Sequence, residues 1–283
     1  MKILKAIITA AGKSQRTLPL QTLVDRDGSP KSALAILADE IISAGIEQIA
    51  VIISPGDAPA YTAAAGPHAQ HMQFIEQAQP LGYGHAVYCA HSFTNSDPFL
   101  LMVGDHLYIS RTNTSCARQL TETAAAENCS VSAVQATHES KLPFYGSVGG
   151  HRIANRERLY QIQTVIEKPT PTEAEQKLIV PGLRTGNYLC FFGIHALSPS
   201  LMELLGQQLN DPQHPRQVNL SAALSDLARR ERYLASELLG RRYDIDRRYG
   251  LLNAQLALGL AGKDRDEVLS QLVELLAQSQ VQS

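Results

Sequence analysis

Short apolar runs separated by amphipathic segments recur along most of the chain. The runs are four to seven residues long, which is typical of buried strands and too short for buried helices. Because predicted helices alternate with these runs, the pattern indicates an α/β fold with a largely parallel sheet. The predicted strands cover residues 6–9, 48–54, 72–76, 99–103 and 130–135.

The segment between the first two predicted strands has the pattern of an amphipathic helix. It begins near Ser29 and Pro30 and ends at Gly45, with apolar side chains on one face. A strand, a helix and a second strand in this order form a right-handed parallel crossover, the unit of a doubly wound sheet. Ligands of such sheets bind outside the carboxyl ends of the strands. The turn after residues 6–9 lies at such an end.

The second half of the chain continues with strands and helices. A hairpin with its turn near Ala154 and Asn155 precedes a strand over residues 184–197, and two amphipathic helices follow. The segment from Lys263 to Ala277 is a further amphipathic helix. We therefore expect one large domain over residues 1–262, and a helix and tail over residues 263–283 that pack on the domain or on a second subunit.

Composition narrows the range of partners. The 283 residues are 44% hydrophobic and have a net charge of −2. This charge gives no overall electrostatic attraction to nucleic acid or to an anionic membrane. No apolar run approaches the ~18 residues of a membrane-spanning helix, and the first residues lack the apolar core of a signal peptide. The four cysteines contain no CxxC pair, which favours free thiols in a reducing compartment. We expect a cytoplasmic protein with small-molecule partners, which binds neither nucleic acid nor a membrane and forms a homo-oligomer if its last helix pairs.

The turn after the first strand has the features of a phosphate site. Ala10, Ala11 and Gly12 allow a sharp turn whose backbone N–H groups surround an anion. Lys13 and Arg16 add positive charge, and a guanidinium binds phosphate oxygens in a bidentate manner. The stretch has neither the GxGxxG pattern of dinucleotide-binding folds nor the GK[ST] ending of a P-loop. An ordinary glycine turn of an α/β protein is the alternative at this point.

Acidic residues in two places suggest a metal site. Asp105 follows the strand over residues 99–103, where a carboxylate is costly unless it is paired or holds a metal ion. Further along, Asp244 and Asp246 stand among arginines. This second cluster is either a solvated turn or a metal ligand with cations for phosphate. The four arginines are Arg241, Arg242, Arg247 and Arg248.

A glycine-containing loop follows the third predicted strand. Gln77 ends this strand, and Gly82 and Gly84 flank a single aromatic residue before a helix that begins at His85. Such a loop can press against a flat ligand. A helix-start histidine that bonds only to backbone is the plain alternative.

Glu167 and Lys168 stand at a predicted strand end. Neighbouring strand residues point to opposite faces, but Pro169 ends the strand, so one of the two side chains can face a ligand. Lys168 suits a sugar phosphate. An exposed ion pair is the alternative.

Five stretches, in order, resemble the sugar-1-phosphate nucleotidyltransferases, and most closely the bacterial UTP–glucose-1-phosphate uridylyltransferases. The resemblance implies a Rossmann-like, glycosyltransferase-A-like fold, with a mixed and mainly parallel sheet flanked by helices, over residues 1–262. It implies that UTP and a sugar-1-phosphate, expected to be glucose-1-phosphate, give a UDP-sugar and pyrophosphate. The stretches, which span almost the whole chain, are AAGKSQRTLP, EQAQPLGYGHAV, VGDHL, VIEKP and GRRYDIDRRYG.

The resemblance also assigns roles to residues. It implies Mg²⁺ ligands at Asp105 and Asp244, with Asp246 as the second option. The nucleotide contacts that it implies come from Ala10, Ala11, Gly12, Lys13, Gln77, Gly82 and His85. The catalytic cations that it implies are Arg16 and Lys168. The sugar-phosphate contacts that it implies come from Gly146, Glu167 and Asn187.

The sequence departs from the family pattern in three places. Ser14 replaces the second glycine of the first loop, and TGNY stands where the family usually has VGRY. The segment after Pro19 is shorter and lacks a lysine that contacts phosphate in the family, so Lys31 is the nearest replacement and a third catalytic candidate. Two alternatives stay open: a regulatory relative that binds nucleotides or nucleotide sugars, and a nucleotidyltransferase for a different base or sugar.

Overall fold

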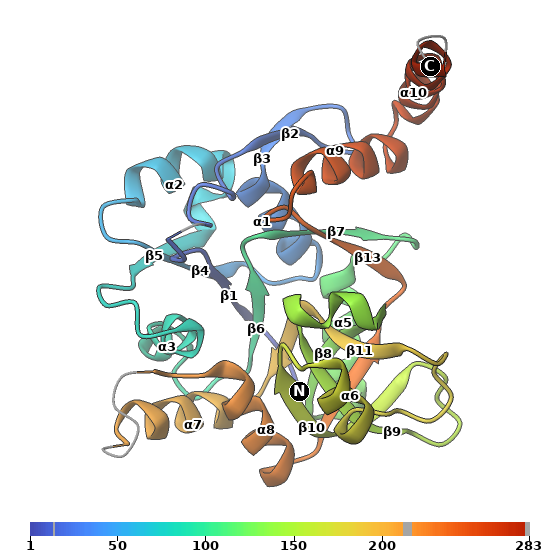
Figure 1. The fold of residues 1–283 in the computed structure, drawn as a ribbon. Helices are drawn as coiled ribbons and strands as arrows, with labels where there is room; N and C mark the ends of the chain where they lie inside the picture. Colours follow the sequence, from blue (N-terminus) through green and yellow to red (C-terminus); the bar gives the residue numbers. More distant parts are fainter. Residues whose placement is uncertain (14, 212–216, 281–283) are drawn as a thin grey trace.

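A nine-stranded mixed sheet forms the centre of the protein in the computed structural model, which describes residues 1–13, 15–211 and 217–280 (Figure 1). Its strand order is β5-β4-β1-β6-β11-β8-β12-β10-β9. The first four strands of this order run parallel. Beyond β6 the pairings are antiparallel except for that of β12 with β8. The strands are β1 (Lys5–Thr9), β4 (Gln48–Ile53), β5 (Met72–Glu76), β6 (Phe99–Val103), β8 (Ser130–His138), β9 (Gly146–Arg152), β10 (Leu159–Glu167), β11 (Asn187–Leu197) and β12 (Tyr233–Glu237).

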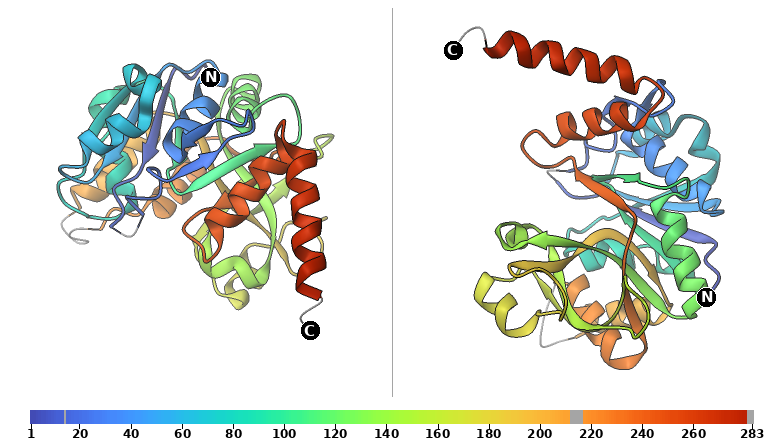
Figure 2. Two further views of the ribbon diagram at one scale, coloured as in Figure 1. Left: turned by 90° about the horizontal axis from the view of Figure 1, so that it is seen from above. Right: turned by 90° about the vertical axis from the view of Figure 1, so that its right-hand side faces the viewer.

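Helices cover both faces of the sheet (Figures 1 and 2). One face packs against α1 (Ala33–Ser43), α2 (Ala58–Ala65) and α5 (Cys116–Glu127). The opposite face packs against α3 (Tyr83–Tyr88), α7 (Ser200–Leu209) and α8 (Leu220–Arg230). The remaining helices are η1 (Gly66–His71), α4 (His91–Thr94), η2 (Glu139–Phe144), α6 (Pro171–Lys177), α9 (Gly250–Ala261) and α10 (Arg265–Gln280).

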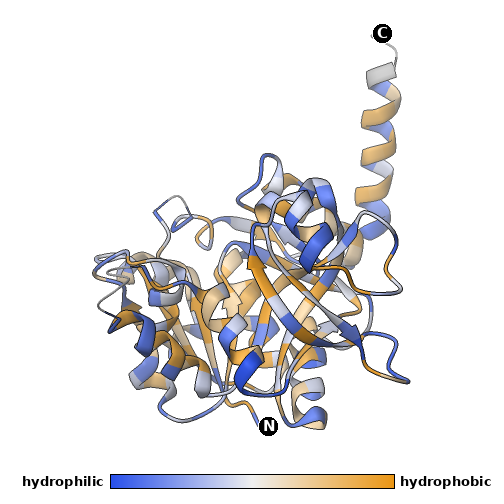
Figure 3. Ribbon diagram, turned by 60° about the horizontal axis from the view of Figure 1, so that its bottom comes forward, coloured by the Kyte–Doolittle hydropathy of each residue, from blue (hydrophilic) through white to orange (hydrophobic). Residues whose placement is uncertain are grey.

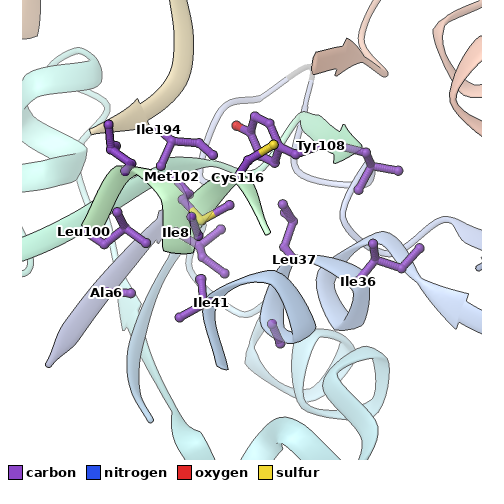
Figure 4. Packing of buried hydrophobic residues seen from close by; sticks show 14 of the residues in the cluster. Ala6, Ile8, Ile36, Leu37, Ile41, Leu100, Met102, Tyr108, Cys116 and Ile194 are labelled. Atoms are coloured by element: carbon purple, nitrogen blue, oxygen red, sulfur yellow. The ribbon is translucent and has the colours of Figure 1, made fainter. Parts of the chain in front are cut away.

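Alternation of side chains along β1 divides the core into two clusters. Ala6 and Ile8 belong to the cluster beneath α1, whereas Ile7 belongs to the cluster beneath α3 and α8. Because both faces of this central strand are covered, its middle residues are completely buried and apolar. Figure 4 shows Ile8 close to Met102 of β6 and Ile41 of α1.

The mixed α/β fold predicted from the sequence is confirmed, and β5 and β6 have the predicted bounds. The first helix, however, begins at Ala33 rather than near Pro30. Pro30–Ser32 forms strand β3, which pairs with β2 (Thr22–Val24), and the Ser32 hydroxyl then caps the helix by accepting a hydrogen bond from the Ala35 N–H at 2.9 Å. The cap places the start three residues later than the proline suggested.

A two-stranded ribbon lies beside the main sheet. It consists of β7 (His106–Ser110) and β13 (Gly240–Asp244), which pair antiparallel so that His106 stands opposite Asp244. The solvated turn considered for the arginine cluster therefore begins only after Asp244. Neither this ribbon nor the β2/β3 pair was predicted from the sequence pattern.

The helix α10 extends away from the body of the protein (Figures 2 and 3). Near its start, Val268 packs against Gly259 of α9. Further along, Leu269 and Val273 are 42% and 58% exposed. The helix itself was predicted, whereas its packing on the domain or on a second subunit stays a prediction. No helix in the described ranges is long and apolar enough to cross a membrane.

Removal of the Ile8 side chain tests whether β1 is the centre of the core. Ile8 is fully buried, so Ile8→Ala loses apolar burial and leaves a cavity. We expect the free energy of unfolding to fall by about 2–5 kcal/mol. Urea denaturation followed by circular dichroism measures this loss. Leu4→Ala is the control, because Leu4 is 50% exposed, and a change of only about 0.5 kcal/mol is expected. Equal losses in both variants would contradict the assignment.

Candidate active site

The ends of four strands meet at a cavity of about 570 Å³. Residues that follow β1 and β6 line the cavity, and the end of β10 contributes further lining residues. Asp244, the last residue of β13, also lines the cavity. The site therefore lies where the carboxyl ends of the strands predicted it.

The turn after β1 lines the cavity with Ala11, Gly12 and Lys13. Ala10 is not part of the lining, because it is buried and its N–H donates to the Ile52 carbonyl at 2.8 Å. The Ala10 N–H is therefore already paired, and the predicted backbone contact of Ala10 with the nucleotide stays a prediction. Ser14 lies outside the described residues.

Arg16 does not reach the cavity lining. Its guanidinium Nη1 lies 3.7 Å from Asp57 Oδ1, and its side chain is about half exposed. Its backbone N–H donates to the Gly12 carbonyl at 2.8 Å, and its own carbonyl accepts a hydrogen bond from the Tyr61 hydroxyl at 2.7 Å. These contacts hold the turn, and they direct the side chain toward α2 rather than toward the site.

Lys31 lies on β3 and is not part of the cavity lining, and its role as a replacement for the missing lysine of the shortened segment stays a prediction. Its ammonium group contacts Asp25, Asp39 and Asp27 at 2.8, 2.9 and 3.0 Å. Burial alone would lower the pKa of Lys31, but hydrogen bonds to these three carboxylates raise it above its usual value. The Lys31 ammonium group thereby links β3 and the turn after β2 to α1.

A hydrogen-bonded loop follows β5. The side chain of Gln77 lines the cavity, and its Nε2 donates to the Gly82 carbonyl at 3.2 Å and to His85 Nδ1 at 3.0 Å. His85 is hydrogen-bonded to Gln77 and is not part of the lining, and its predicted contact with the nucleotide stays a prediction. Burial lowers the pKa of His85, so the neutral ring accepts this hydrogen bond near neutral pH.

The same loop is tied to the segment before α8. Gly82 has a φ of +104°, and a Cβ on it would lie 2.8 Å from the Val218 carbonyl oxygen, so glycine is required there. Gly84 N–H donates to this carbonyl at 3.0 Å, and Val218 N–H donates to the Leu81 carbonyl at 2.9 Å. These bonds hold the loop against α8.

Glu167 and Lys168 both line the cavity, as the strand end allows. Glu167 Oε2 accepts a hydrogen bond from the Ser221 hydroxyl of α8 at 2.6 Å. Gly146 stands opposite Glu167 on β9, and a Cβ there would lie 2.9 Å from the same oxygen. Lys168 has a φ of +46°, which turns the chain so that consecutive side chains reach one cavity. The Lys168 ammonium group is therefore a positive charge directly next to Glu167 in the chain.

Asn187 is not brought to the cavity. It begins β11 opposite His138, and its amide Nδ2 donates to the Thr185 carbonyl at 3.4 Å. The sugar contact of Asn187 stays a prediction. The lining residues of β11 are Phe191, Gly193 and His195.

Asp105, His106 and Asp244 form a cluster with the chemistry of a metal site. Each offers one ligand atom, and these atoms lie within 4.8 Å of one another. His106 Nδ1 is 2.7 Å from Asp105 Oδ1, and Gln15 Nε2 donates to Asp105 Oδ2 at 2.7 Å. Burial raises the pKa of Asp105, but the hydrogen bond and charge of His106 and the charge of Arg247 bring it below its usual value. Asp105 is thus a carboxylate at neutral pH.

Several lining residues were missed by sequence reasoning. His106 was hidden because the ribbon β7/β13 was not predicted, and its proximity to Asp244 follows only from that register. Gln15 lay within the predicted phosphate turn, but its Nε2 bonds to Asp105 and, at 3.2 Å, to Asp246 Oδ2, which no local pattern indicates. Ser221 had no signal, because its partner Glu167 lies far away in the sequence.

The sequence profile of the nucleotidyl transferase family matches residues 5–240. The chain belongs to this family. One relative of this nucleotidyl transferase is the UTP–glucose-1-phosphate uridylyltransferase YngB of Bacillus subtilis, which is 28% identical over 97% of this chain and 95% of its own length. A UTP–glucose-1-phosphate uridylyltransferase of Streptococcus pyogenes is also 28% identical, over 92% of this chain and 90% of its own length.

Solved structures share the fold of this nucleotidyl transferase. UDP-glucose pyrophosphorylase from Acinetobacter baumannii superimposes with a TM-score of 0.77 at 24% identity, over 96% of this chain and 99% of its own. A UDP-glucose pyrophosphorylase solved with UDP-glucose gives a TM-score of 0.73 at 23% identity, over 90% and 98%. The Rossmann-like nucleotidyltransferase fold expected from the sequence is confirmed.

A buried polar network reaches the cavity wall through His195. Its Nδ1 lies 2.6 Å from the Ser132 hydroxyl, which also hydrogen-bonds to the Tyr233 hydroxyl. The His195 and Phe191 rings pack edge to face, with their centres 4.9 Å apart. Burial lowers the pKa of His195 to about 3, so the folded protein holds this ring neutral.

The His195 pKa predicts a loss of stability in acid. In the unfolded chain this ring binds a proton near pH 6.5, whereas in the folded chain it does so only near pH 3. Between these values the unfolded chain binds more protons than the folded chain, so the free energy of unfolding falls as the pH drops. From pH 7 to pH 5 we expect this group to remove about 2 kcal/mol of unfolding free energy. Urea titrations of the wild type and His195→Asn at both pH values measure the difference. Identical pH dependence in the two proteins would show that His195 does not titrate in this way.

Proposed function

We propose that this nucleotidyl transferase couples UTP with glucose-1-phosphate to form UDP-glucose and pyrophosphate. The proposal rests on one observation: two groups of charged side chains line the same cavity. Asp105 and Asp244 lie at the β7/β13 ribbon, and Glu167 and Lys168 lie at the end of β10. The substrate assignment is supported by the relatives named above, which are UTP–glucose-1-phosphate uridylyltransferases.

The nucleotide is bound by the turn after β1 and the loop after β5. Gly12 and Lys13 line the cavity where a polyphosphate meets the strand end. Both amide hydrogens of Gln77 are engaged by Gly82 and His85, which leaves Gln77 Oε1 as an acceptor. We assign this oxygen to the N3–H of uracil, which is a donor that cytosine lacks.

The sugar phosphate is bound at the end of β10. Glu167 is a charged acceptor for sugar hydroxyl groups, and the Ser221 hydroxyl fixes its orientation. Lys168 lies beside it and supplies positive charge for the phosphate. Gly146 leaves room for the Glu167 carboxylate, because a Cβ there would lie 2.9 Å from Glu167 Oε2 and 2.9 Å from the Phe191 ring.

The carboxylates fit a divalent cation that prefers oxygen ligands, and we propose Mg²⁺ at Asp105 and Asp244. When bound, this ion neutralises negative charge on the phosphate oxygens. Asp246 also lines the cavity, but its Oδ2 accepts a hydrogen bond from Gln15 Nε2. We therefore propose that Asp246 orients the Gln15 side chain and does not bind the metal ion. His106 holds Asp105 through its Nδ1 and thereby orients the first ligand.

The reaction needs positioning more than acid or base chemistry. A phosphate oxygen of glucose-1-phosphate forms a bond to the α-phosphorus of UTP, while the bond to the β-phosphate oxygen breaks and pyrophosphate leaves. Lys13 and Lys168 stabilise charge on the phosphoryl groups, and the rigid strand ends hold both substrates in line.

The cysteines support a cytoplasmic location for this reaction. All four are free thiols, which is the state favoured in a reducing compartment. Neither Cys116 nor Cys190, the two buried ones, is exposed to oxidants.

Pyrophosphate release tests the proposed reaction. Purified protein with UTP, glucose-1-phosphate and Mg²⁺ is expected to release pyrophosphate in a coupled assay. Asp105→Asn removes a metal ligand without changing size, and kcat is expected to fall by about 100-fold or more. Asp226→Asn, at a partly exposed position on α8, is the matched control and retains the wild-type rate.

Two results would redirect the proposal. UTP binding by calorimetry without turnover would favour a regulatory nucleotide-binding protein. Release with another triphosphate or sugar phosphate, in a panel that holds the other substrate constant, would replace UTP or glucose-1-phosphate in the assignment.

We also propose that α10 joins two copies of the chain. An open groove of about 490 Å³ between α9 and the ribbon is lined by apolar side chains, including Leu256 and Leu260, with Arg111 and Arg241 among them. The exposed apolar residues of α10 recur four apart at Leu269 and Val273, beside Glu267 and Glu274, which are also exposed. The apolar stripe and acidic charge of α10 therefore complement the groove of a second copy.

Light scattering after size exclusion tests this interface. The wild type is expected to be a dimer or larger, and the double variant Leu269→Glu/Val273→Glu a monomer, because each glutamate places a charge in an apolar contact. Ser270→Glu, which adds a charge at another exposed position of α10, keeps the wild-type mass. A monomeric wild type, or an unchanged mass in the double variant, would reject the interface.

A further inference from the structure

Arg247 is the arginine that lines the cavity in the part of the chain that the structure describes. It follows β13 in the turn 244–250, and its guanidinium carbon lies 3.9 Å from the centre of the Phe144 ring. Its Nε donates to Asp244 Oδ2 at 2.9 Å. The side chain is 40% exposed, so its remaining N–H groups are open to a ligand in the cavity.

The other arginines of the cluster have different surroundings. Arg242 stacks on Tyr145 at 3.7 Å and donates to the Phe191 carbonyl. Arg241 lies in the groove beside α9, and Arg248 lies over Tyr249, 5.3 Å from the ring centre. Arg16, the predicted phosphate-binding arginine, faces Asp57 instead of the cavity. Arg247 is therefore the guanidinium placed to meet a ligand at Asp105 and Asp244.

The ion pair between Arg247 and Asp244 weakens the binding of a divalent cation at this carboxylate. A divalent cation on Asp244 competes with the guanidinium for the same carboxylate, and the two positive groups repel each other. A polyphosphate between them removes the conflict, because phosphate oxygens bind both a divalent cation and a guanidinium. Phe144 offers the guanidinium a flat surface that keeps it beside the cavity while it changes partner.

We propose that Arg247 binds the β- and γ-phosphate oxygens of the nucleoside triphosphate, and that it exchanges Asp244 for these oxygens when a divalent cation occupies Asp105 and Asp244. Arg247 thereby supplies the positive charge that the shortened segment after Pro19 does not. The inference rests on the proposed nucleotide-binding function. It adds a phosphate contact from the C-terminal part of the chain, and it makes metal binding and nucleotide binding cooperative through one carboxylate.

The test separates metal binding from phosphate binding. Mn²⁺, which prefers the same oxygen ligands, is titrated alone and followed by electron paramagnetic resonance. UTP and inorganic pyrophosphate are then titrated by calorimetry in the presence of saturating Mn²⁺. Pyrophosphate lacks the base and the sugar, so it reports on the phosphate contacts alone. The proteins compared are the wild type, Arg247→Ala, Arg247→Lys and Arg248→Ala, each checked for an unchanged thermal unfolding midpoint.

The expected results have opposite signs for the two ligands. Arg247→Ala frees Asp244, so Mn²⁺ alone binds more tightly than to the wild type. UTP and pyrophosphate bind to the same variant about 10-fold to 100-fold more weakly. Arg247→Lys loses less, because it keeps the charge but not the bidentate geometry. Arg248→Ala, which removes the same charge one residue away and outside the lining, leaves all three affinities unchanged.

Two outcomes overturn the inference. If Arg247→Ala binds pyrophosphate as tightly as the wild type, Arg247 does not contact phosphate. If the variant loses affinity for Mn²⁺ alone together with UTP, Arg247 only positions Asp244. In both cases the wild type still binds UTP, and the proposed function stands. A wild type that binds neither UTP nor pyrophosphate overturns the proposed function and this inference together.

Discussion

The pairing of β7 with β13 is the constraint on which the site depends. Asp105 stands at the end of a buried strand, where a lone carboxylate is costly. The antiparallel register brings Asp244 from the C-terminal part of the chain to a position opposite His106. The ribbon is fixed to the main sheet by the Tyr108 hydroxyl, which donates to the Gly193 carbonyl at 3.0 Å. A shift of one residue in this register would turn Asp244 to the other face of the ribbon and separate it from Asp105 and His106.

The centre of the fold and the region of the site could be predicted from the sequence. The buried strands β1, β4 and β6 have continuous apolar runs, because both faces of this parallel part of the sheet are covered. Their carboxyl ends then specify where a ligand binds. Gly12 follows β1, Asp105 follows β6 and Lys168 follows β10, and all three line one cavity.

The directions of individual side chains could not be predicted, because they depend on partners that are distant in sequence. Arg16 and Lys31 have the charge that a phosphate site requires, but Arg16 pairs with Asp57 just before α2, and Lys31 pairs with Asp39 of α1. Arg247 reaches the cavity because Phe144 and Asp244 hold it there. The ribbon was hidden for a related reason: β13, with the sequence GRRYD, is mostly polar and lacks the alternation or continuous apolar run that indicates a strand.

The segment before α8 connects the two halves of the cavity. Val218 exchanges hydrogen bonds with the loop after β5, and Ser221, one turn further, holds Glu167 at the end of β10. A substrate that orders this loop therefore also reduces the freedom of the helix start that orients Glu167. The second substrate then meets a carboxylate whose conformational entropy has already been lost, and it binds more tightly. Because such linkage is reciprocal, the affinity of each substrate depends on the other although the two need not touch.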